Sequence, residues 1–446
     1  MSARELAMEV LTRVEENKAY SNLQLNSALQ RASLSSQDAA LATELVYGTV
    51  SRLNTLDYFL ERFVAKGIKK LQPWVRNLLR LSLYQMMYLD RIPPHAVVNE
   101  AVNLAKRRGH QGISGMVNGV LRNVLRHREE LVLPDDLSPA ERIALEHSHP
   151  QWLVERWIRQ YGESTTEAIC RANNEPPSVS VRVNTTMITR EEMLAEMKKA
   201  GFEAAPSALS SEGILVYGGG NMALTEWYRD GQISIQDESS MLVGGTVGPA
   251  PGMRVLDCCA APGGKTSHMA ELMEDQGEII ANDLHEHKQK LIAEQAERLG
   301  LASIHTVSGN AMELVQKYPA GSFDRILLDA PCSGLGVIRR KPDLKWTKTA
   351  GDIGEIASLQ RELLDSVSSL LRIGGILVYS TCTIDPEENE GTVRHFLETH
   401  PGFGYPEDSS GEWDKLHSAA GGVGVQILPQ DYHSDGFYIA RLQRFS

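Results

Sequence analysis

Residues 253–266 read MRVLDCCAAPGGKT, a short apolar run that ends in a turn of small residues, and this stretch decides the fold that we predict. Two later stretches also place reactive side chains after a short apolar run: LLDAPCSG at 327–334 and YSTCT at 379–383. In an open α/β sheet, ligands bind beyond the carboxyl ends of the strands. We therefore expect three side chains to meet along one edge of a parallel sheet: Asp257, Asp329 and Cys382.

From residue 253 onward the sequence alternates between strand-like and helix-like segments. The expected strands are MRVLD (253–257), GEIIAND (277–283), SIHTVS (303–308), DRILLD (324–329) and GILVYS (375–380). Helices are expected to begin at Lys265, His285 and Ile356. This alternation is typical of a doubly wound sheet, so residues 236–446 are predicted to form a Rossmann-like α/β domain.

The 446-residue chain is 42% apolar and 23% charged, which is ordinary for a globular protein of roughly two to four domains. No segment approaches the roughly 18 to 20 uninterrupted apolar residues of a membrane span. The charged first segment also lacks the apolar core and cleavage site of a secretory signal, so we expect a cytoplasmic protein. The five cysteines include no C-x-x-C pair, and we expect neither disulfides nor a metal site.

The amino-terminal block, residues 1–130, has apolar residues at helical spacing and is predicted to be an all-α domain of six or seven helices. Residues 1–128 contain 18 Lys and Arg against 10 Asp and Glu, a net charge of +8 within a chain of net charge −12. These cations are either a solvated surface or a phosphate-binding face, and both interpretations stay open. The cations concerned are Lys106, Arg107, Arg108, Arg122, Arg126 and Arg128.

Residues 92–126, IPPHAVVNEAVNLAKRRGHQGISGMVNGVLRNVLR, resemble the core of the helical RNA-binding domain of the transcription antitermination factor NusB. The resemblance implies a NusB-like RNA-binding fold for residues 1–130. It depends on the spacing of Asn99, Glu100, Asn118, Gly119 and Arg122.

Residues 131–149 are rich in acid and proline and are predicted to be a linker. Residues 150–235 are predicted to form a small α+β domain that binds RNA. Within it Arg182 and Asn184 share one face of an expected strand. These two side chains either grip RNA backbone or form the polar outer face of a surface strand.

The turn at residues 260–265 suits a nucleotide-like cofactor, because small residues let the backbone approach a ligand and a helix N-terminus follows. It is neither a P-loop nor a dinucleotide fingerprint, since the glycines that those motifs need are missing. Asp283 lies 20 residues after Gly263, where a carboxylate holds ribose hydroxyls. S-adenosylmethionine has the matching shape, with its amino-acid end near the turn.

Cys332 and Cys382 both follow strand-like runs, and thiolates are suitable nucleophiles for a soft carbon such as C6 of a pyrimidine. Asp329 beside Cys332 can hydrogen-bond the N3 and N4 edge of cytosine. Cys170, Cys258 and Cys259 are expected to be small buried apolar residues.

These motifs, in this order and with a NusB-like front end, resemble the Sun family of RNA cytosine-5 methyltransferases. The resemblance implies that Cys382 attacks C6, that Cys332 helps remove the C5 proton and that Asp329 orients the base. It implies S-adenosylmethionine contacts at Cys259, Ala260, Ala261, Pro262, Gly263, Gly264, Lys265, Asp283, Asn310 and Asp329. The family commonly has Asp at the position of Asn310. In the segment RRKPDLKW, Arg339 and Lys345 are expected to contact RNA phosphates near the flipped-out base.

Small-subunit ribosomal RNA is therefore the expected partner, and no stable protein partner is implied. Transfer RNA is the main rival substrate, because the same catalytic motifs serve it and only the front end argues against it. A DNA cytosine methyltransferase would take its nucleophile from the Pro-Cys position and would not need Cys382. A non-catalytic RNA-binding protein is disfavoured because both cysteines are present.

Overall fold

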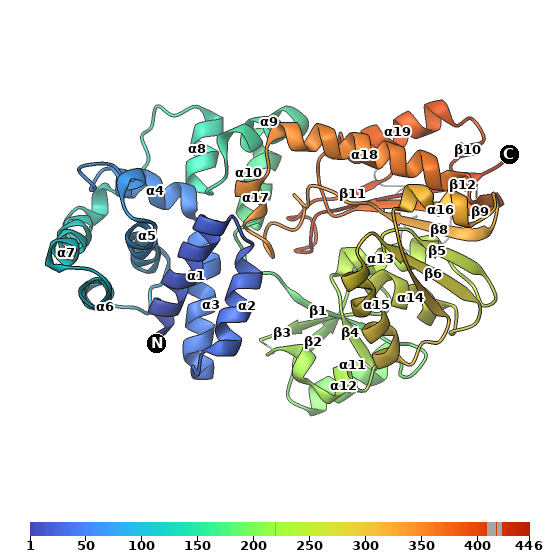
Figure 1. Ribbon diagram of the computed structural model, residues 1–446, viewed down its shortest axis with the longest axis horizontal. Coiled ribbons are helices and arrows are strands. Elements are labelled where there is room, and N and C mark those ends of the chain that lie inside the picture. The colour runs from blue at the N-terminus through green and yellow to red at the C-terminus, as the bar shows by residue number, and fades with distance from the viewer. Residues whose placement is uncertain (219, 408–415, 417–421) are drawn as a thin grey trace. The chain divides into compact units, whose positions relative to one another are not determined.

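The computed structural model describes residues 1–218, 220–407, 416 and 422–446 (Figure 1). These residues form two compact units. The first unit contains Met1–Glu175 and the separate segment Ile338–Lys348, and the second contains Pro176–Val337 and Thr349–Ser446. Among the described helices, none is both long enough and apolar enough to cross a membrane.

The first unit is built from helices. Its α-helices are α1 (Ala3–Asn17), α2 (Ser21–Arg31), α3 (Ser36–Ser51), α4 (Leu53–Glu61), α5 (Pro73–Tyr88), α6 (Pro94–Arg108), α7 (Gln111–Arg126), α8 (Pro139–Glu146), α9 (Gln151–Tyr161), α10 (Glu163–Ala172) and α17 (Leu344–Thr347). The short 3-10 helices η1 (Ile68–Lys70) and η2 (Arg128–Glu130) lie between them. Residues 1–126, all described, hold seven α-helices, which confirms the predicted all-α domain.

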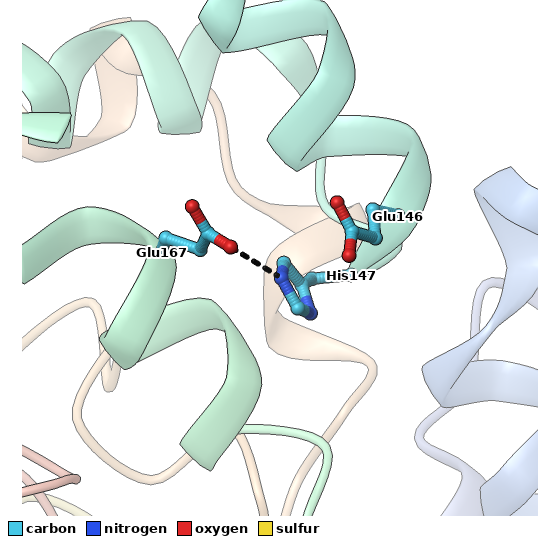
Figure 2. Close-up of side chains that lie close together, drawn as sticks. All are labelled: Glu146, His147 and Glu167. Carbon is cyan, nitrogen blue, oxygen red and sulfur yellow. Dashed lines mark ion pairs between the residues drawn. The ribbon is translucent and has the colours of Figure 1, made fainter. Parts of the chain in front are cut away.

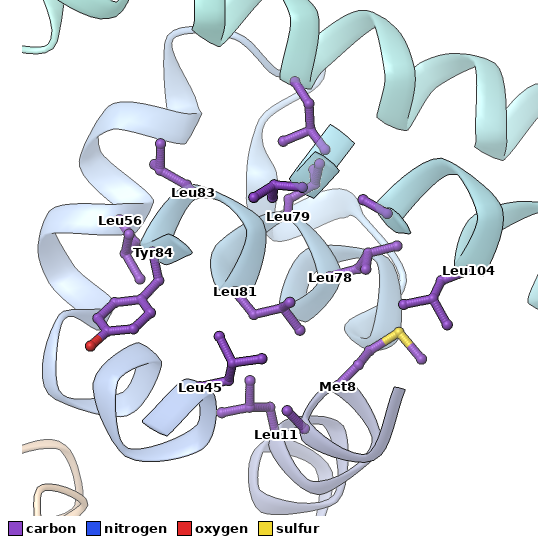
Figure 3. Close-up of a cluster of buried hydrophobic side chains, with 14 of the residues drawn as sticks. Met8, Leu11, Leu45, Leu56, Leu78, Leu79, Leu81, Leu83, Tyr84 and Leu104 are labelled. Atoms are coloured by element: carbon purple, nitrogen blue, oxygen red, sulfur yellow. The ribbon is translucent and has the colours of Figure 1, made fainter. Parts of the chain in front are cut away.

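Helix α5 forms the centre of the first unit's hydrophobic core (Figure 3). Its apolar residues are buried around most of its circumference, as expected of a helix enclosed by others. In Figure 3, Leu78 and Leu81 of α5 lie among Met8 of α1 and Leu45 of α3.

Gly48 in α3 allows that helix to pack closely against α5. A Cβ atom at Gly48 would lie only 2.0 Å from Cζ of the Tyr84 ring. The Tyr84 hydroxyl donates a hydrogen bond to Glu44, one turn before Gly48 in α3. Glycine at this position therefore lets the buried Tyr84 ring approach the backbone of α3 closely while its hydroxyl bonds Glu44.

The expectation of a linker at residues 131–149 is wrong for its second half, which contains α8. Ser138 and Glu141 form a capping box at the start of this helix, and Pro139 occupies its first turn. Ile143 and Ala144 on the inner face of α8 are buried. The acid and proline that suggested a linker are helix-start signals, and the first unit continues through α10 to Glu175.

The second unit begins with a small antiparallel sheet of order β2-β3-β1-β4. The strands are β1 (Val179–Val183), β2 (Glu203–Pro206), β3 (Gly213–Tyr217) and β4 (Ile233–Ile235). Its helices are α11 (Arg190–Lys199), η3 (Met222–Leu224) and α12 (Glu226–Arg229). Met193 and Met197 of α11 pack with Val181 and Val183 of β1 in one buried cluster, which confirms the predicted small α+β domain.

The larger sheet of the second unit has the order β10-β12-β9-β8-β5-β6-β7, with β11 paired to β12. Its strands are β5 (Arg254–Asp257), β6 (Glu278–Asp283), β7 (Ile304–Ser308), β8 (Phe323–Asp329), β9 (Leu371–Thr381), β10 (Phe403–Gly404), β11 (Val425–Ile427) and β12 (Phe437–Arg444). Strands β7, β6, β5, β8 and β9 are parallel, and β12 runs antiparallel to β9. The chain proceeds from β5 to β6 and β7 on one side and returns to β8 and β9 on the other, as predicted for a doubly wound fold. The antiparallel strands at the β12 edge were not predicted.

Helices cover both faces of this sheet (Figure 1). They are α13 (Glu238–Val247), α14 (Gly264–Leu272), α15 (Glu286–Leu299), η4 (Ala311–Glu313), α16 (Leu314–Lys317), α18 (Ala350–Ser368) and α19 (Glu390–Thr399). Alternate residues of each strand enter different cores, as the period of two requires. Leu256 and Leu328 pack with α18 and α19, whereas Val255 and Leu327 pack with α13, α14 and α15.

Arg182 of β1 is fully buried and joins the small sheet to helix α14 within the second unit. Its Nη2 and Nε donate to the two carboxylate oxygens of Glu271 at 2.8 and 3.1 Å, and its Nη1 donates to the Gly264 carbonyl at 2.9 Å. Asn184 is buried too, and its amide donates to the Gly231 carbonyl at 3.1 Å. Both side chains are used inside the protein, so the expectation that they grip RNA backbone is wrong.

Replacing Gly48 by Ala is expected to lower the free energy of unfolding by about 1–3 kcal/mol, because the added methyl group overlaps the Tyr84 ring. The control is Gly115→Ala in α7, where an added Cβ meets nothing within 4 Å. That control should be neutral or stabilising by up to about 1 kcal/mol. Urea unfolding followed by circular dichroism measures both, and equal effects of the two variants would contradict the packing argument.

Replacing Arg182 by Met is expected to cost about 3–5 kcal/mol, because the buried Glu271 carboxylate loses its partner. Hydrogen exchange of the amides in β1 and α14 measures the loss locally. The control is Arg394→Met, which breaks the half-exposed pair with Glu390 and should leave the stability almost unchanged, because exposed ion pairs contribute little. Changing Glu271 to Met as well should restore most of the lost stability. If Arg182→Met lowers the stability no more than Arg394→Met does, the pair of Arg182 and Glu271 is not structurally important.

Candidate active site

The register of the parallel strands brings the predicted edge residues together. Asp257 at the end of β5 lies opposite Leu327 of β8, and Asp329 at the end of β8 lies opposite Ser380 of β9. Cys382 directly follows β9. The convergence expected from three separate stretches of sequence is therefore present in the structure.

The turn after β5 forms one wall of a pocket of about 170 Å³. Its lining residues are Ile235, Gln236, Ser240, Asp257, Cys259, Ala260, Ala261, Pro262, Gly264, Lys265 and Asp329. Gly263 has φ +102°, and its Cβ position lies 3.2 Å from the Cα of Ile292, so the turn requires glycine there. A Cβ at Gly264 would meet no atom within 4 Å, so the backbone is open to a ligand at the start of α14.

Lys265 and Asp329 form an ion pair across this pocket. The Lys265 Nζ donates to Asp329 Oδ2 at 2.7 Å, and the Ser380 hydroxyl donates to Asp329 Oδ1 at 2.8 Å. Burial disfavours the charge of Lys265, but the Asp329 carboxylate outweighs burial and raises the Lys265 pKa. Both oxygens of Asp329 are thus oriented, and an ammonium group lies beside the cysteine loops.

Two further carboxyl groups occupy the same edge of the sheet. Burial raises the pKa of Asp257 to about 7, although the Thr266 hydroxyl donates to it at 2.7 Å and favours its ionised form. Asp283 closes β6 and accepts hydrogen bonds from the backbone amides of Ala261 and His285, both at 3.2 Å. Asp283 therefore supports the turn directly, in the position expected of a ribose-binding carboxylate.

Asn310, after β7, uses its side-chain oxygen locally. Its Oδ1 accepts a hydrogen bond from the Met312 amide at 3.1 Å and caps the short helix η4. Aspartate can make the same cap, so the exchange of Asp for Asn leaves this turn intact.

The structure brings Cys332 and Cys382 into contact, with their sulfur atoms 3.3 Å apart. The hydrogen bond with Cys382 and burial both raise the pKa of the Cys332 thiol. Two thiols at this distance do not both ionise readily, because each thiolate disfavours the other. Cys170 and Cys258 are fully buried and burial raises their thiol pKa values, as the structural interpretation of them predicted.

The expected RNA contact of Lys345 is wrong, because this side chain is completely buried in the first unit. Its Nζ donates to the Ser51 carbonyl at 2.8 Å and to Asn174 Oδ1 at 3.2 Å. Burial lowers the Lys345 pKa well below its usual range. Arg339 of the same segment is only 8% exposed, so its guanidinium does not form an open phosphate-binding surface either.

Part of the predicted basic face is neutralised within the first unit. Arg107 lies 3.8 Å from Glu5, and Arg108 donates to Glu9 at 2.9 Å. The exposed side chain of Lys106 belongs to the same turn of α6. The basic excess counted in the sequence thus overstates the charge that this turn presents.

Glu146, His147 and Glu167 form a small cluster of potential metal ligands in the first unit (Figure 2). Arg142 donates to Glu146 at 3.0 Å and to Glu167 at 2.8 Å, and its charge offsets the two carboxylates. Burial lowers the pKa of His147, which lies 3.8 Å from Glu167. The carboxylates already bind a cation of the protein itself.

Glu388 is the residue near the cysteines that the sequence analysis missed. It lies in a PEENE segment after the Thr-Cys line, and its carboxylate accepts a hydrogen bond from the Ser333 amide at 2.8 Å. Three glutamates among the four residues after Pro386 suggest an exposed turn, so the sequence offered only the closeness of Glu388 to Cys382 as a signal.

Family models match three parts of the chain. A model described as 16S rRNA methyltransferase RsmB/F matches residues 245–443, and the NusB family model matches residues 1–126. A ferredoxin-like domain of RsmF/B-like methyltransferases matches residues 149–223. These matches confirm the predicted NusB-like front end and the small middle domain.

Relatives match along the whole chain. A probable ribosomal RNA small subunit methyltransferase B of Bacillus subtilis is 45% identical and covers 99% of both chains. Its counterpart in Synechocystis is 38% identical and covers 100% of both chains. Among solved structures, PH0851 has a TM-score of 0.81 at 26% identity, covering 100% of this chain and 99% of its own. NSun6 from Pyrococcus horikoshii, solved with SFG, has a TM-score of 0.59 at 25% identity and covers 67% of this chain and 98% of its own.

Identity of 45% over nearly the complete length of both proteins is far above chance, and the order of the matched domains agrees with the order of the structural elements. The sequence motifs, the edge of the larger sheet and the helical front end all support one assignment. The chain belongs to the family of 16S rRNA methyltransferases RsmB/F.

Proposed function

We propose that this protein transfers the methyl group of S-adenosylmethionine to C5 of a cytidine in small-subunit ribosomal RNA, through a covalent bond between Cys382 and C6. The observation that carries the proposal is the pair of sulfur atoms 3.3 Å apart, next to the ion pair of Lys265 and Asp329. The names of the relatives supply the class of RNA.

The pocket beside the turn suits the cofactor. The open backbone at Gly264 and the N-terminus of α14 would receive its carboxylate, and Asp283 would hold its ribose hydroxyls. Asn310 lies beside the same edge, where its amide would meet the adenine. When bound there, S-adenosylmethionine supplies an electrophilic methyl carbon. The structural relative solved with SFG, an analogue of this cofactor, agrees with the assignment.

Cys382 is the better nucleophile of the two thiols. The raised pKa of Cys332 keeps that thiol protonated, so it can donate a hydrogen bond to a Cys382 thiolate. Cys382 lies close enough to Lys265 to raise the Lys265 pKa. The Lys265 ammonium in turn favours the thiolate form of Cys382. The thiolate adds to C6, the C5–C6 double bond opens and C5 becomes nucleophilic. Meanwhile the Asp329 carboxylate accepts a hydrogen bond from the N4 amino group of the base.

Cys332 acts after C5 has bonded to the methyl carbon, whose bond to the cofactor's sulfur would break, with S-adenosylhomocysteine as the leaving group. Once Cys382 is bonded to carbon, its negative charge is gone and the ionisation of Cys332 becomes easier. Cys332 then releases its own proton to solvent and removes the proton from C5. The C5–C6 double bond re-forms, and Cys382 leaves as a thiolate, which restores the site.

The Cys332→Ala variant is expected to trap a covalent complex with RNA, because methylation proceeds but the C5 proton stays and Cys382 cannot leave. Incubation with S-adenosylmethionine and unmodified small-subunit RNA, followed by denaturing electrophoresis, reveals RNA that migrates with the protein. Cys382→Ala should form no complex, and its methyl transfer should fall by at least about 1,000-fold, in the range seen on loss of a nucleophile.

Cys170→Ala is the matched control, because that thiol is buried in the first unit and its loss should neither trap RNA nor lower methyl transfer. Transfer RNA serves as a second substrate in parallel reactions. Trapping on transfer RNA alone would overturn the RNA class and keep the chemistry. Trapping by Cys382→Ala in place of Cys332→Ala would reverse the two roles.

A further inference from the structure

Glu388 connects the two loops that carry the paired cysteines. Ser333 directly follows Cys332, and Thr383 directly follows Cys382. The Glu388 carboxylate accepts hydrogen bonds from the Ser333 amide at 2.8 Å, from the Ser333 hydroxyl and from the Thr383 hydroxyl at 3.2 Å. The two hydroxyl oxygens are themselves 2.8 Å apart. One carboxylate thus holds the residues next to both sulfur atoms.

This network is closed to solvent. Ser333, Thr383 and Glu388 each have 0% of their surface exposed. Burial raises the Glu388 pKa, while the hydrogen bonds from Ser333 favour its ionised form. A buried carboxyl group destabilises the fold unless hydrogen-bond donors satisfy it. The buried donors of this network likewise have no water that could take the place of the Glu388 carboxylate. The position of each loop is therefore tied to the position of the other.

Glu388 is itself held from two further elements. Gln360 of α18 donates to Glu388 at 3.1 Å and to the Pro331 carbonyl, just before Cys332, at 2.9 Å. Tyr379 of β9 donates its hydroxyl to the Glu388 carbonyl at 2.6 Å. The separation of the two thiols is thus set by a rigid helix and a central strand, with Glu388 as the shared group.

We propose that Glu388 is a positioning residue that sets the separation and direction of the Cys332 and Cys382 thiols. The inference deepens the proposed function and rests on it for its catalytic consequence. The two sulfur atoms must reach two neighbouring carbons of one ring, C5 and C6, so a shift of either loop is costly. A displacement of about 1 Å between reacting groups can cost roughly 100-fold in rate.

The first test measures thiol geometry without RNA or cofactor. The probe is phenylarsine oxide, a trivalent arsenical that binds two adjacent thiols together, titrated into the full-length reduced protein. Glu388→Ala is expected to weaken this binding by about tenfold or more, since it removes two or more hydrogen bonds that join the loops. Glu388→Gln keeps the shape and one acceptor, and should weaken it by about threefold. Cys332→Ala defines the binding that other thiols contribute.

Thr166→Ala is the matched control. Thr166 is equally buried, lies in α10 of the first unit and donates at 2.7 Å to the Gly162 carbonyl, so its loss removes a buried hydrogen bond away from the cysteine loops. It should bind the arsenical like wild type. If Glu388→Ala fails to fold, as judged by circular dichroism, Glu388→Gln decides the matter. Wild-type arsenical affinity in the folded Glu388 variant overturns the positioning role.

The second test measures methyl transfer. Glu388→Ala should lower kcat by about 100-fold while KM for S-adenosylmethionine changes by less than about threefold, with partial rescue in Glu388→Gln. A rise in KM with unchanged kcat would overturn the proposal. If the arsenical result holds but wild type methylates no RNA, the proposed function fails and the positioning of the thiols stands.

Discussion

The parallel register of β5, β8 and β9 is the constraint on which the candidate active site depends. It places Asp257 opposite Leu327 and Asp329 opposite Ser380. The loops that follow these strands therefore begin at the same edge of the sheet. Hydrogen bonds between strands hold this register in a core that is apolar on both faces. A shift of one residue would turn the alternating side chains to the opposite face and separate the reactive groups.

Within that framework, buried polar groups supply the precision. Arg182 pairs with Glu271 and also holds the Gly264 carbonyl in the turn after β5. Glu388 performs a similar task for the loops after β8 and β9. Such groups are stable only when their partners are complete, because the interior offers no water as a substitute. The same demand makes them poor candidates for surface recognition, however charged they look in the sequence.

The segment Ile338–Lys348 lies between Cys332 and Cys382 in the sequence but belongs to the helical unit. Lys345 donates to the carbonyl of Ser51, the last residue of α3, one of the carbonyls that a helix end leaves without an intrahelical partner. Trp346 donates to the neighbouring Val50 carbonyl at 2.8 Å, and the Ser21 hydroxyl donates to Asp343 at 2.6 Å. The segment therefore packs within the first unit, where Asp343 and Lys345 stabilise the fold.

The sequence by itself determined the kinds of element and the strand-end chemistry. Apolar runs that stop at Asp257, Asp329 and Cys382 are local features, and parallel topology brings their ends together in any doubly wound sheet. The helical front end was equally readable, because periodic apolar residues define amphipathic helices. The acid and proline of residues 131–149 were misread, although Ser138 and Glu141 carry the local signature of a helix start.

Only the tertiary structure decided which charged side chains are buried. In the sequence, Arg182, Lys345 and Glu388 cannot be told apart from exposed charged residues. Partners that hold them in the interior lie far away in the sequence. Arg182 is 89 residues from Glu271, and Glu388 is 55 residues from Ser333. Which charged side chains are buried, and which partners they bond, depends on packing between elements that are distant in the sequence. The spacing of residues therefore predicts the reactive side chains but not the buried side chains that orient them.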